Sequence, residues 1–128
     1  MRRFANCIKA VAVGATLTTT LYCMQDRIPH WAVGWGANRS GELGIGSNIN
    51  STLPHKLSQQ FRDISSKKSV SAAIGADGRV YVWGKVWKGL LAEGVNTNCL
   101  LPTEVESLPI GRYKQVECGQ NGLCVISE

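Results

Sequence analysis

The sequence predicts an all-β fold built from propeller-type blades, and three observations support this prediction. A Trp-Gly mark at residues 35–36 recurs at residues 83–84, 48 residues later. Two β-rich runs flank an Asp-Gly pair at residues 77–78, which is a strong hairpin signal. From residue 31 onward the apolar residues show no helical spacing. Repeated units of short strands are typical of propeller blades.

The first element along the chain, residues 1–27, is expected to be a helical targeting segment. It has no acidic residue up to residue 25, whereas Arg2, Arg3 and Lys9 are basic. On a helical wheel these bases lie largely opposite an apolar face, and this combination is typical of mitochondrial presequences. The segment therefore predicts a mitochondrial location.

Two other interpretations of this segment stay open. One is a secretory signal, although Lys9 interrupts the apolar region and no small-residue cleavage site follows. Asn38 and Asn50 would then be glycosylation acceptors. The other is an inner-membrane anchor over residues 7–24, which is nearly long enough to span a bilayer but only weakly hydrophobic. Residues 28–31 are expected to link the segment to the repeats.

The next element, residues 31–46, is predicted to be a strand entry followed by a compact loop. Its glycines follow one another too closely for a helix or a regular strand ladder, and several are expected to need positive φ. Leu43 is expected to anchor the loop in the core, and Asn38 to hydrogen-bond local backbone. The glycines of this loop are Gly36, Gly41, Gly44 and Gly46.

The two repeats are predicted at residues 32–80 and 81–128, and the second is incomplete. Pro54 recurs as Pro102 at the same offset as the Trp-Gly mark. Further along, the register requires four inserted residues near 108–111. The loop of the second copy lacks one of the glycines, so we expect that loop to be rebuilt.

These motifs resemble the regulator of chromosome condensation repeat family. Its units combine Trp-Gly-x-Asn-x-x-Gly-x-Leu-Gly-x-Gly with a later Asp-Gly-x-Val-Tyr-x-Trp-Gly. Residues 35–46 match the first pattern at every fixed position, and residues 77–84 match the second. The family's usual Cys-Gly-x-x-His segment lacks its histidine at residues 66–70 and at residues 118–122. The positions carried over as structural repeat positions are Trp35, Gly36, Asn38, Gly41, Leu43, Gly44, Gly46, Asp77, Gly78, Trp83 and Gly84.

The resemblance implies a partial β-propeller, because such propellers close with about seven blades and this sequence supplies about two repeats. The outer blade faces and the strand near residues 123–126 are then expected to lack neighbours. Such an edge is a template for association with another chain. We therefore expect self-association, or completion of the ring by another chain.

Charge and residue spacing argue against several classes of function. The net charge of +5 falls to +2 once residues 1–27 are set aside, and the remaining charges are interspersed, so no nucleic-acid partner is expected. Five cysteines without paired spacing and two histidines, His30 and His55, give no metal site. No cofactor fingerprint and no nucleophile with a nearby base is found. We therefore expect no cofactor, no catalytic residue and no enzymatic activity.

The expected function is that of a non-enzymatic scaffold that binds an unidentified protein partner. Mitochondrial members of the family are associated with respiratory complex III assembly and mitochondrial ribosome biogenesis, so the resemblance implies assistance in assembling a respiratory or ribosomal complex. One alternative is guanine-nucleotide exchange on a Ran-like small GTPase, the activity of the founding family member. The other is a truncated propeller fragment without independent function.

Overall fold

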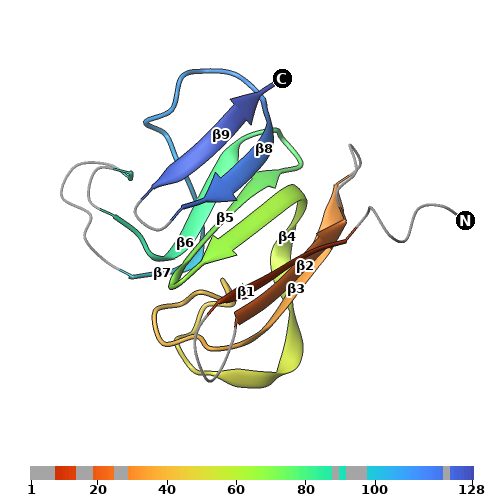
Figure 1. Ribbon diagram of the computed structural model, residues 1–128, viewed down its shortest axis with the longest axis vertical. Coiled ribbons are helices and arrows are strands. Elements are labelled where there is room, and N and C mark those ends of the chain that lie inside the picture. The colour runs from red at the N-terminus through yellow and green to blue at the C-terminus, as the bar shows by residue number, and fades with distance from the viewer. Residues whose placement is uncertain (1–7, 14–18, 25–28, 88–89, 92–97, 120–121) are drawn as a thin grey trace, which may run out of the picture.

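The computed structural model describes residues 8–13, 19–24, 29–87, 90–91, 98–119 and 122–128, and all regular elements in these ranges are antiparallel strands (Figure 1). This confirms the all-β prediction for the described part of the chain. The strands are β1 (Ile8–Val13), β2 (Thr19–Met24), β3 (His30–Gly36), β4 (Ser51–Lys67), β5 (Val70–Gly75), β6 (Val80–Lys85), β7 (Asn98–Glu104), β8 (Tyr113–Cys118) and β9 (Leu123–Ser127). Strands β1 to β7 form one sheet in sequence order, and β8 pairs with β9.

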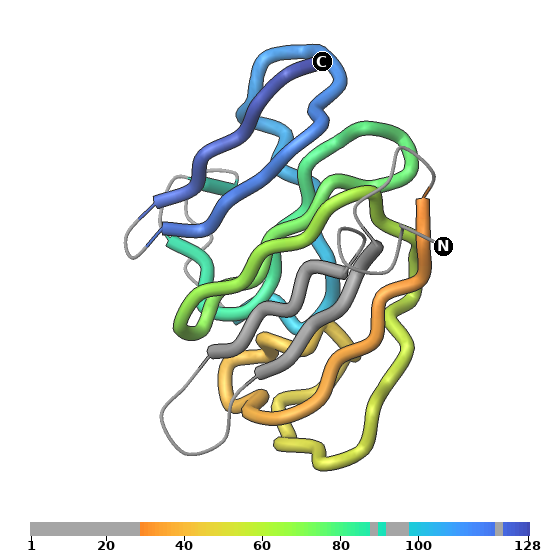
Figure 2. The backbone as a smooth tube through the Cα atoms, turned by 45° about the vertical axis from the view of Figure 1, so that its right-hand side comes forward, coloured from red at the N-terminus to blue at the C-terminus, as the bar shows by residue number. Residues whose placement is uncertain are grey.

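Strand β4 joins two blades, because its two halves pair with different neighbours. Its first half, up to Phe61, pairs with β3, and its second half, from Phe61 to Lys67, pairs with β5. The ladder is irregular where the partner changes, between Phe61 and Asp63. Figure 2 shows β4 continuing from beside β3 to beside β5. The first blade is therefore β1, β2, β3 and the start of β4, the second is the rest of β4 with β5, β6 and β7, and β8–β9 begins a third.

The strand register supports this division into blades. Equivalent partners in the three hairpins are Ala12 with Thr20, Ser66 with Ser71, and Cys118 with Leu123. In both four-stranded blades the second strand of this hairpin also pairs with the strand that carries the repeat tryptophan. Thr20 lies opposite Trp35, and Ser71 lies opposite Trp83. The N-terminal segment thus supplies the first two strands of the first blade.

The helix expected within residues 1–27 is wrong where the structure describes this segment, because β1 and β2 are strands. The sequences Ile-Lys-Ala-Val-Ala-Val and Thr-Thr-Leu-Tyr-Cys-Met are rich in β-branched and aromatic residues, and pairing with β3 supplies tertiary hydrogen bonds that an isolated helix lacks. Strand β3 begins at His30, so the strand takes up the end of the expected linker at residues 28–31. Residues 1–7, 14–18 and 25–28 lie outside the described residues. Within the described ranges, no helix has the length and apolar character needed to cross a membrane.

The core consists of two clusters, one on each face of the second blade. Successive side chains of a strand point to opposite faces, so Ala73 and Trp83 face the first blade, while Ala72, Ile74 and Val82 face β8 and β9. Every residue of β5 is therefore buried. The second blade is the middle layer of the described structure.

Two buried polar side chains link the second blade to β8. The Val116 amide donates to Asp63 Oδ2 at 2.9 Å, and the Cys118 amide donates to Ser65 Oγ at 3.0 Å. A buried amide without a partner is costly, so these side chains take the place of the carbonyl groups that a neighbouring strand would present. The contact fixes β8 against β4.

Candidate functional site

The loop after β3, residues 37–50, packs against the second blade and is a structural element. The Glu42 carbonyl accepts hydrogen bonds from Trp83 Nε1 at 2.7 Å and from Ser71 Oγ at 2.8 Å. A Cβ atom on Gly44 would lie 2.8 Å from Trp83 Nε1, and its φ of +68° also favours glycine. This close approach explains why the repeat pattern has glycine beside the tryptophan of the next unit.

Asn38 organises the same loop from within. Its Oδ1 accepts from the Leu43 amide at 2.9 Å, while its Nδ2 donates to the Ser47 and Ile49 carbonyls at 2.8 and 3.1 Å. The Asn38 amide donates to Asn50 Oδ1 at 2.8 Å. Since Asn38 is fully buried, it is not available as a glycosylation acceptor in the folded chain.

The other predicted repeat positions differ in burial. Leu43 and Trp83 are fully buried, whereas Trp35 is half-buried and so differs from its counterpart Trp83. Asp77 lies in the exposed hairpin turn, where its Oδ1 accepts from the Arg79 amide at 3.0 Å. The repeat glycines with positive φ are Gly36, Gly41, Gly44, Gly46, Gly78 and Gly84. All these residues shape turns or cores and do not converge on a ligand-sized site.

A surface cleft that sequence reasoning missed lies where the second blade passes into β8. Its volume is about 250 Å³, and we call it the insertion cleft, because the residues inserted near 108–111 form one wall. The four-residue insertion in the second repeat is the sequence signal that could have located it. The lining residues are Arg79, Val80, Glu104, Val105, Glu106, Leu108, Pro109, Ile110, Gly111 and Tyr113.

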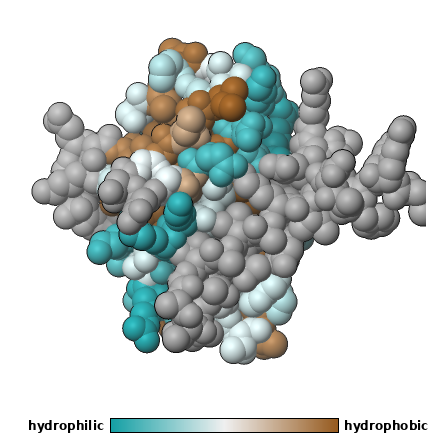
Figure 3. Space-filling model, viewed as in Figure 1, coloured by the Kyte–Doolittle hydropathy of each residue, from teal (hydrophilic) through white to brown (hydrophobic). Residues whose placement is uncertain are grey.

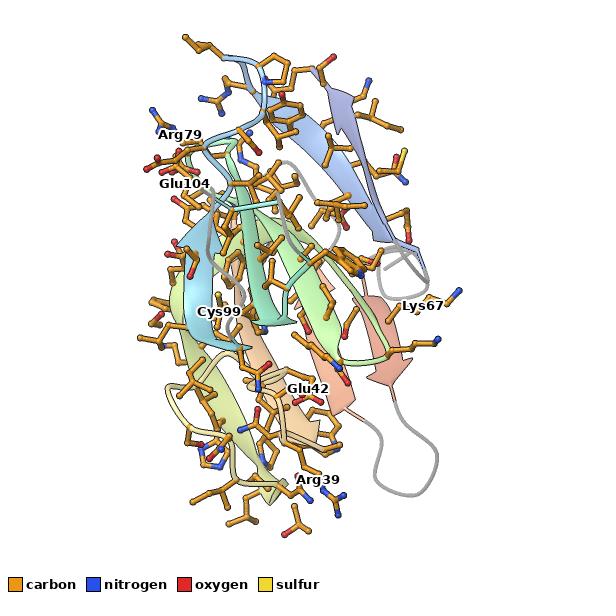
Figure 4. All side chains as sticks on the ribbon, turned by 90° about the vertical axis from the view of Figure 1, so that its left-hand side faces the viewer. Arg39, Glu42, Lys67, Arg79, Cys99 and Glu104 are labelled. Carbon is orange, nitrogen blue, oxygen red and sulfur yellow. The ribbon has the colours of Figure 1, made fainter. Side chains whose placement is uncertain are left out.

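The rim of the insertion cleft is charged. Arg79 forms an ion pair with Glu104, which raises the pKa of the Arg79 guanidinium, and Figure 4 shows the two side chains together at one end of the molecule. Glu106 is exposed and has no ion-pair partner among the described residues. Within the described part of the chain, the cleft therefore carries one negative charge without an ion-pair partner.

The floor of the insertion cleft is apolar and offers no nucleophile with a base. Val80, Val105 and Tyr113 are buried, and the Tyr113 hydroxyl donates to the Pro109 carbonyl at 2.9 Å. The lining contains no histidine, cysteine, serine or threonine. Across the described ranges, no three His, Cys, Asp or Glu side chains are placed to hold a metal ion. This chemistry suits binding of a side chain more than activation of a substrate.

Residues 34–77 and 77–126 each match the family model described as regulator of chromosome condensation (RCC1) repeat. The chain belongs to the RCC1 repeat family. This confirms the resemblance predicted from residues 35–46 and 77–84. The match runs from the end of β3 into β9, so it includes the loop after β3 but not β1 or β2.

The chain is similar to two much longer proteins. It is 32% identical over 117 residues to the ultraviolet-B receptor UVR8 of Arabidopsis thaliana, covering 88% of this chain and 25% of the receptor. It is 37% identical over 89 residues to the human E3 ubiquitin-protein ligase HERC2, covering 66% of this chain and 2% of the ligase. The chain thus spans a quarter or less of these relatives.

Solved structures of RCC1-type propellers share the fold. Human WBSCR16 superposes with a TM-score of 0.77 at 19% identity, covering 99% of this chain and 32% of that one. Prp20p of Saccharomyces cerevisiae, a structure reported with its binding to Gsp1p and histones, superposes with a TM-score of 0.62 at 20% identity, covering 91% and 29%. These likenesses establish the propeller-type arrangement of this RCC1-repeat chain.

Proposed function

We propose that this chain is a non-enzymatic, protein-binding scaffold of the RCC1 type, which acts in mitochondria and assists the assembly of a respiratory or ribosomal complex. The observation that carries the binding function is the insertion cleft, an apolar floor with a charged rim that is held by two rigid sheets. Rigid blades with variable loops are suited to presenting such a surface to a partner.

The mitochondrial part of the proposal is supported by the composition of the N-terminal segment. Residues 1–25 contain basic residues and no acidic one, which is typical of import signals. Because β1 and β2 pair with each other and β2 pairs with β3, we propose that residues 8–24 stay with the folded protein after import. The described residues contain no feature that favours guanine-nucleotide exchange over this function.

The test is fractionation of cells that express the full chain with a C-terminal tag. We expect the tag to be protected from added protease in intact mitochondria and to sediment with complex III intermediates or ribosomal subunits. Replacing Arg2, Arg3 and Lys9 with glutamate should abolish import. A secreted or cytosolic protein would contradict the location, and sedimentation only as the free chain would contradict the assembly role.

A further inference from the structure

The insertion cleft exists because the second repeat breaks a strand that the first repeat keeps continuous. In the first repeat, β4 runs without interruption from Ser51 to Lys67. In the second, the equivalent path leaves β7 at Glu104 and enters β8 only at Tyr113, with the four extra residues in between. The insertion has therefore replaced a continuous strand with a projecting loop at this one blade junction.

The loop is held in place at its base and presents an apolar side chain to solvent. The Tyr113 amide donates to the Gly78 carbonyl at 2.8 Å, and the Tyr113 hydroxyl holds the Pro109 carbonyl at 2.9 Å. Ile110, which lies between Pro109 and Tyr113 in the chain, lines the cleft and has an exposed fraction of 108%. An apolar side chain held out beside an apolar cleft loses water contact when a ligand covers it, and preorganisation lowers the entropy cost of that binding.

The charge of the rim selects the ligand. Arg79 is compensated by Glu104, whereas Glu106 is exposed and forms no ion pair within the part of the chain that the structure describes. Asp77, whose carboxylate accepts from the Arg79 amide, adds a second negative group near the rim. A ligand that places an ammonium or guanidinium group here gains electrostatic attraction, while a carboxylate is repelled.

We propose that the insertion cleft binds an extended protein segment in which an apolar side chain enters the cleft and an adjacent Lys or Arg pairs with Glu106. The apolar side chain packs on the accessible wall formed by Leu108, Pro109 and Ile110. This inference rests on the proposed scaffold function and names the surface and the chemical class of segment that the scaffold recognises.

The test measures binding of a fluorescent peptide, acetyl-Gly-Ser-Leu-Lys-Lys-Leu-Ser-Gly-amide, to the full chain by fluorescence polarisation. A second peptide carries glutamate in place of both lysines. We expect saturable binding of the basic peptide, and affinity for the acidic peptide lower by about tenfold or more. Equal affinity for the two peptides, or no binding of the basic one, would overturn the proposal.

Variants locate the binding on the chain. Ile110→Asp should weaken binding of the basic peptide by about tenfold, and Glu106→Lys should weaken it and strengthen binding of the acidic peptide. The matched control is Ile49→Asp, because Ile49 is also exposed, with an exposed fraction of 72%. Ile49 belongs to the loop that carries Arg39 and Glu42, and Figure 4 shows this loop far from Arg79 and Glu104. An equal loss with Ile49→Asp, or no exchange of preference with Glu106→Lys, would contradict the site.

A deletion tests whether the insertion itself is responsible. Removing residues 108–111 gives the second repeat the spacing of the first, and thermal melting shows whether the variant folds. Peptide binding that survives in a folded deletion variant contradicts the proposal. If Ile110→Asp still enters mitochondria and sediments with the same complex, the inference about the cleft is wrong and the proposed mitochondrial function stands. If the chain binds the peptide but never enters mitochondria, the inference stands and the proposed mitochondrial function is wrong.

Discussion

Trp83 is the residue at which the first and second blades meet. It is fully buried, its ring centroid lies 5.6 Å from that of Phe61, and its Nε1 holds the carbonyl of Glu42 from the loop of the preceding unit. The Trp-Gly mark identified Trp83 and its counterpart Trp35 as repeat positions, but it did not indicate that their burial differs. Trp35 is half-buried in the structure because burial depends on the neighbouring blade and loop, which no local pattern describes.

We expect Trp83→Ala to lower the free energy of unfolding by about 3–5 kcal/mol, the usual cost of deleting a buried tryptophan side chain. Trp35→Ala and Trp87→Ala should cost less, because both side chains are half-buried. Urea denaturation followed by circular dichroism gives the three values. Equal denaturation midpoints for the three variants would show that Trp83 contributes no more to stability than Trp35 or Trp87.

Tyr81 is expected to titrate abnormally. Burial, and then a hydrogen bond of 2.7 Å from its hydroxyl to Asp77 Oδ2, raises the pKa of Tyr81 to about 12. An unfolded tyrosine ionises near pH 10, about two units lower. The protonated hydroxyl is therefore favoured in the folded state, and its contribution to stability is complete below about pH 10 and is lost between about pH 10 and pH 12.

Phenolate absorbance of the full chain, with Tyr81→Phe as the reference, isolates this titration. Asp77→Asn should lower the pKa of Tyr81 but leave it above the ordinary value, since burial remains. A wild-type midpoint near the ordinary value would show that the hydroxyl is open to water.

At the scale of elements, the sequence predicted the hairpin that carries an Asp-Gly turn and missed the β1–β2 hairpin, which has none. Asp77-Gly78 marks the turn between β5 and β6, and both strands were found. The β1–β2 hairpin has neither an Asp-Gly turn nor a Trp-Gly mark, and its threonines and alternating alanines also suit a presequence. Its strand character depends on pairing with β3, which is tertiary information.

Residues 28–128, made alone, should form larger assemblies than the full chain. Without β2, the edge of β3 loses its hydrogen-bonding partner and offers open amide and carbonyl groups to another chain. The matched control lacks only residues 1–7 and keeps both strands. Light scattering after size-exclusion chromatography compares the sizes of their assemblies, and assemblies of residues 28–128 no larger than those of the control would show that the hairpin is dispensable.

The insertion cleft is also a product of element arrangement. The register showed that four residues were inserted, but not that the start of β6, the end of β7 and the new loop would meet there. Arg79 and Glu104 are 25 residues apart in the sequence, and they form an ion pair only because β6 and β7 lie side by side in the sheet. Local patterns therefore gave the repeat and the location of the insertion, and the fold gave the site.

At the scale of the whole molecule, the described blades are covered unequally. The second blade is packed on both faces, whereas β9 pairs only with β8 among the described residues. Figure 3 shows apolar surface gathered over the region of β8 and β9, where Ile126 is 45% exposed and Cys124 is exposed. Contiguous apolar surface of this kind promotes association.

We expect the full chain to self-associate through this face, and Ile126→Lys to shift it toward the monomer. Leu53→Lys is the matched control, because Leu53 is also exposed but lies on β4 of the first blade. Light scattering at several protein concentrations measures the change. An equal shift with both variants would indicate a general effect of added charge, and no shift with either would place the contact elsewhere.

The shared strand β4 has a consequence for the order of folding. As the chain is synthesised, the residues up to Phe61 are enough to close the first blade, and the strand then continues as the first strand of the second. The finished first blade thus leaves behind an ordered strand that serves as the nucleus for the second, and most new contacts form between segments close in the chain. Folding should therefore proceed from the N-terminus toward the C-terminus. A break introduced into β4 after Phe61 should prevent the second blade from folding and leave the first blade intact.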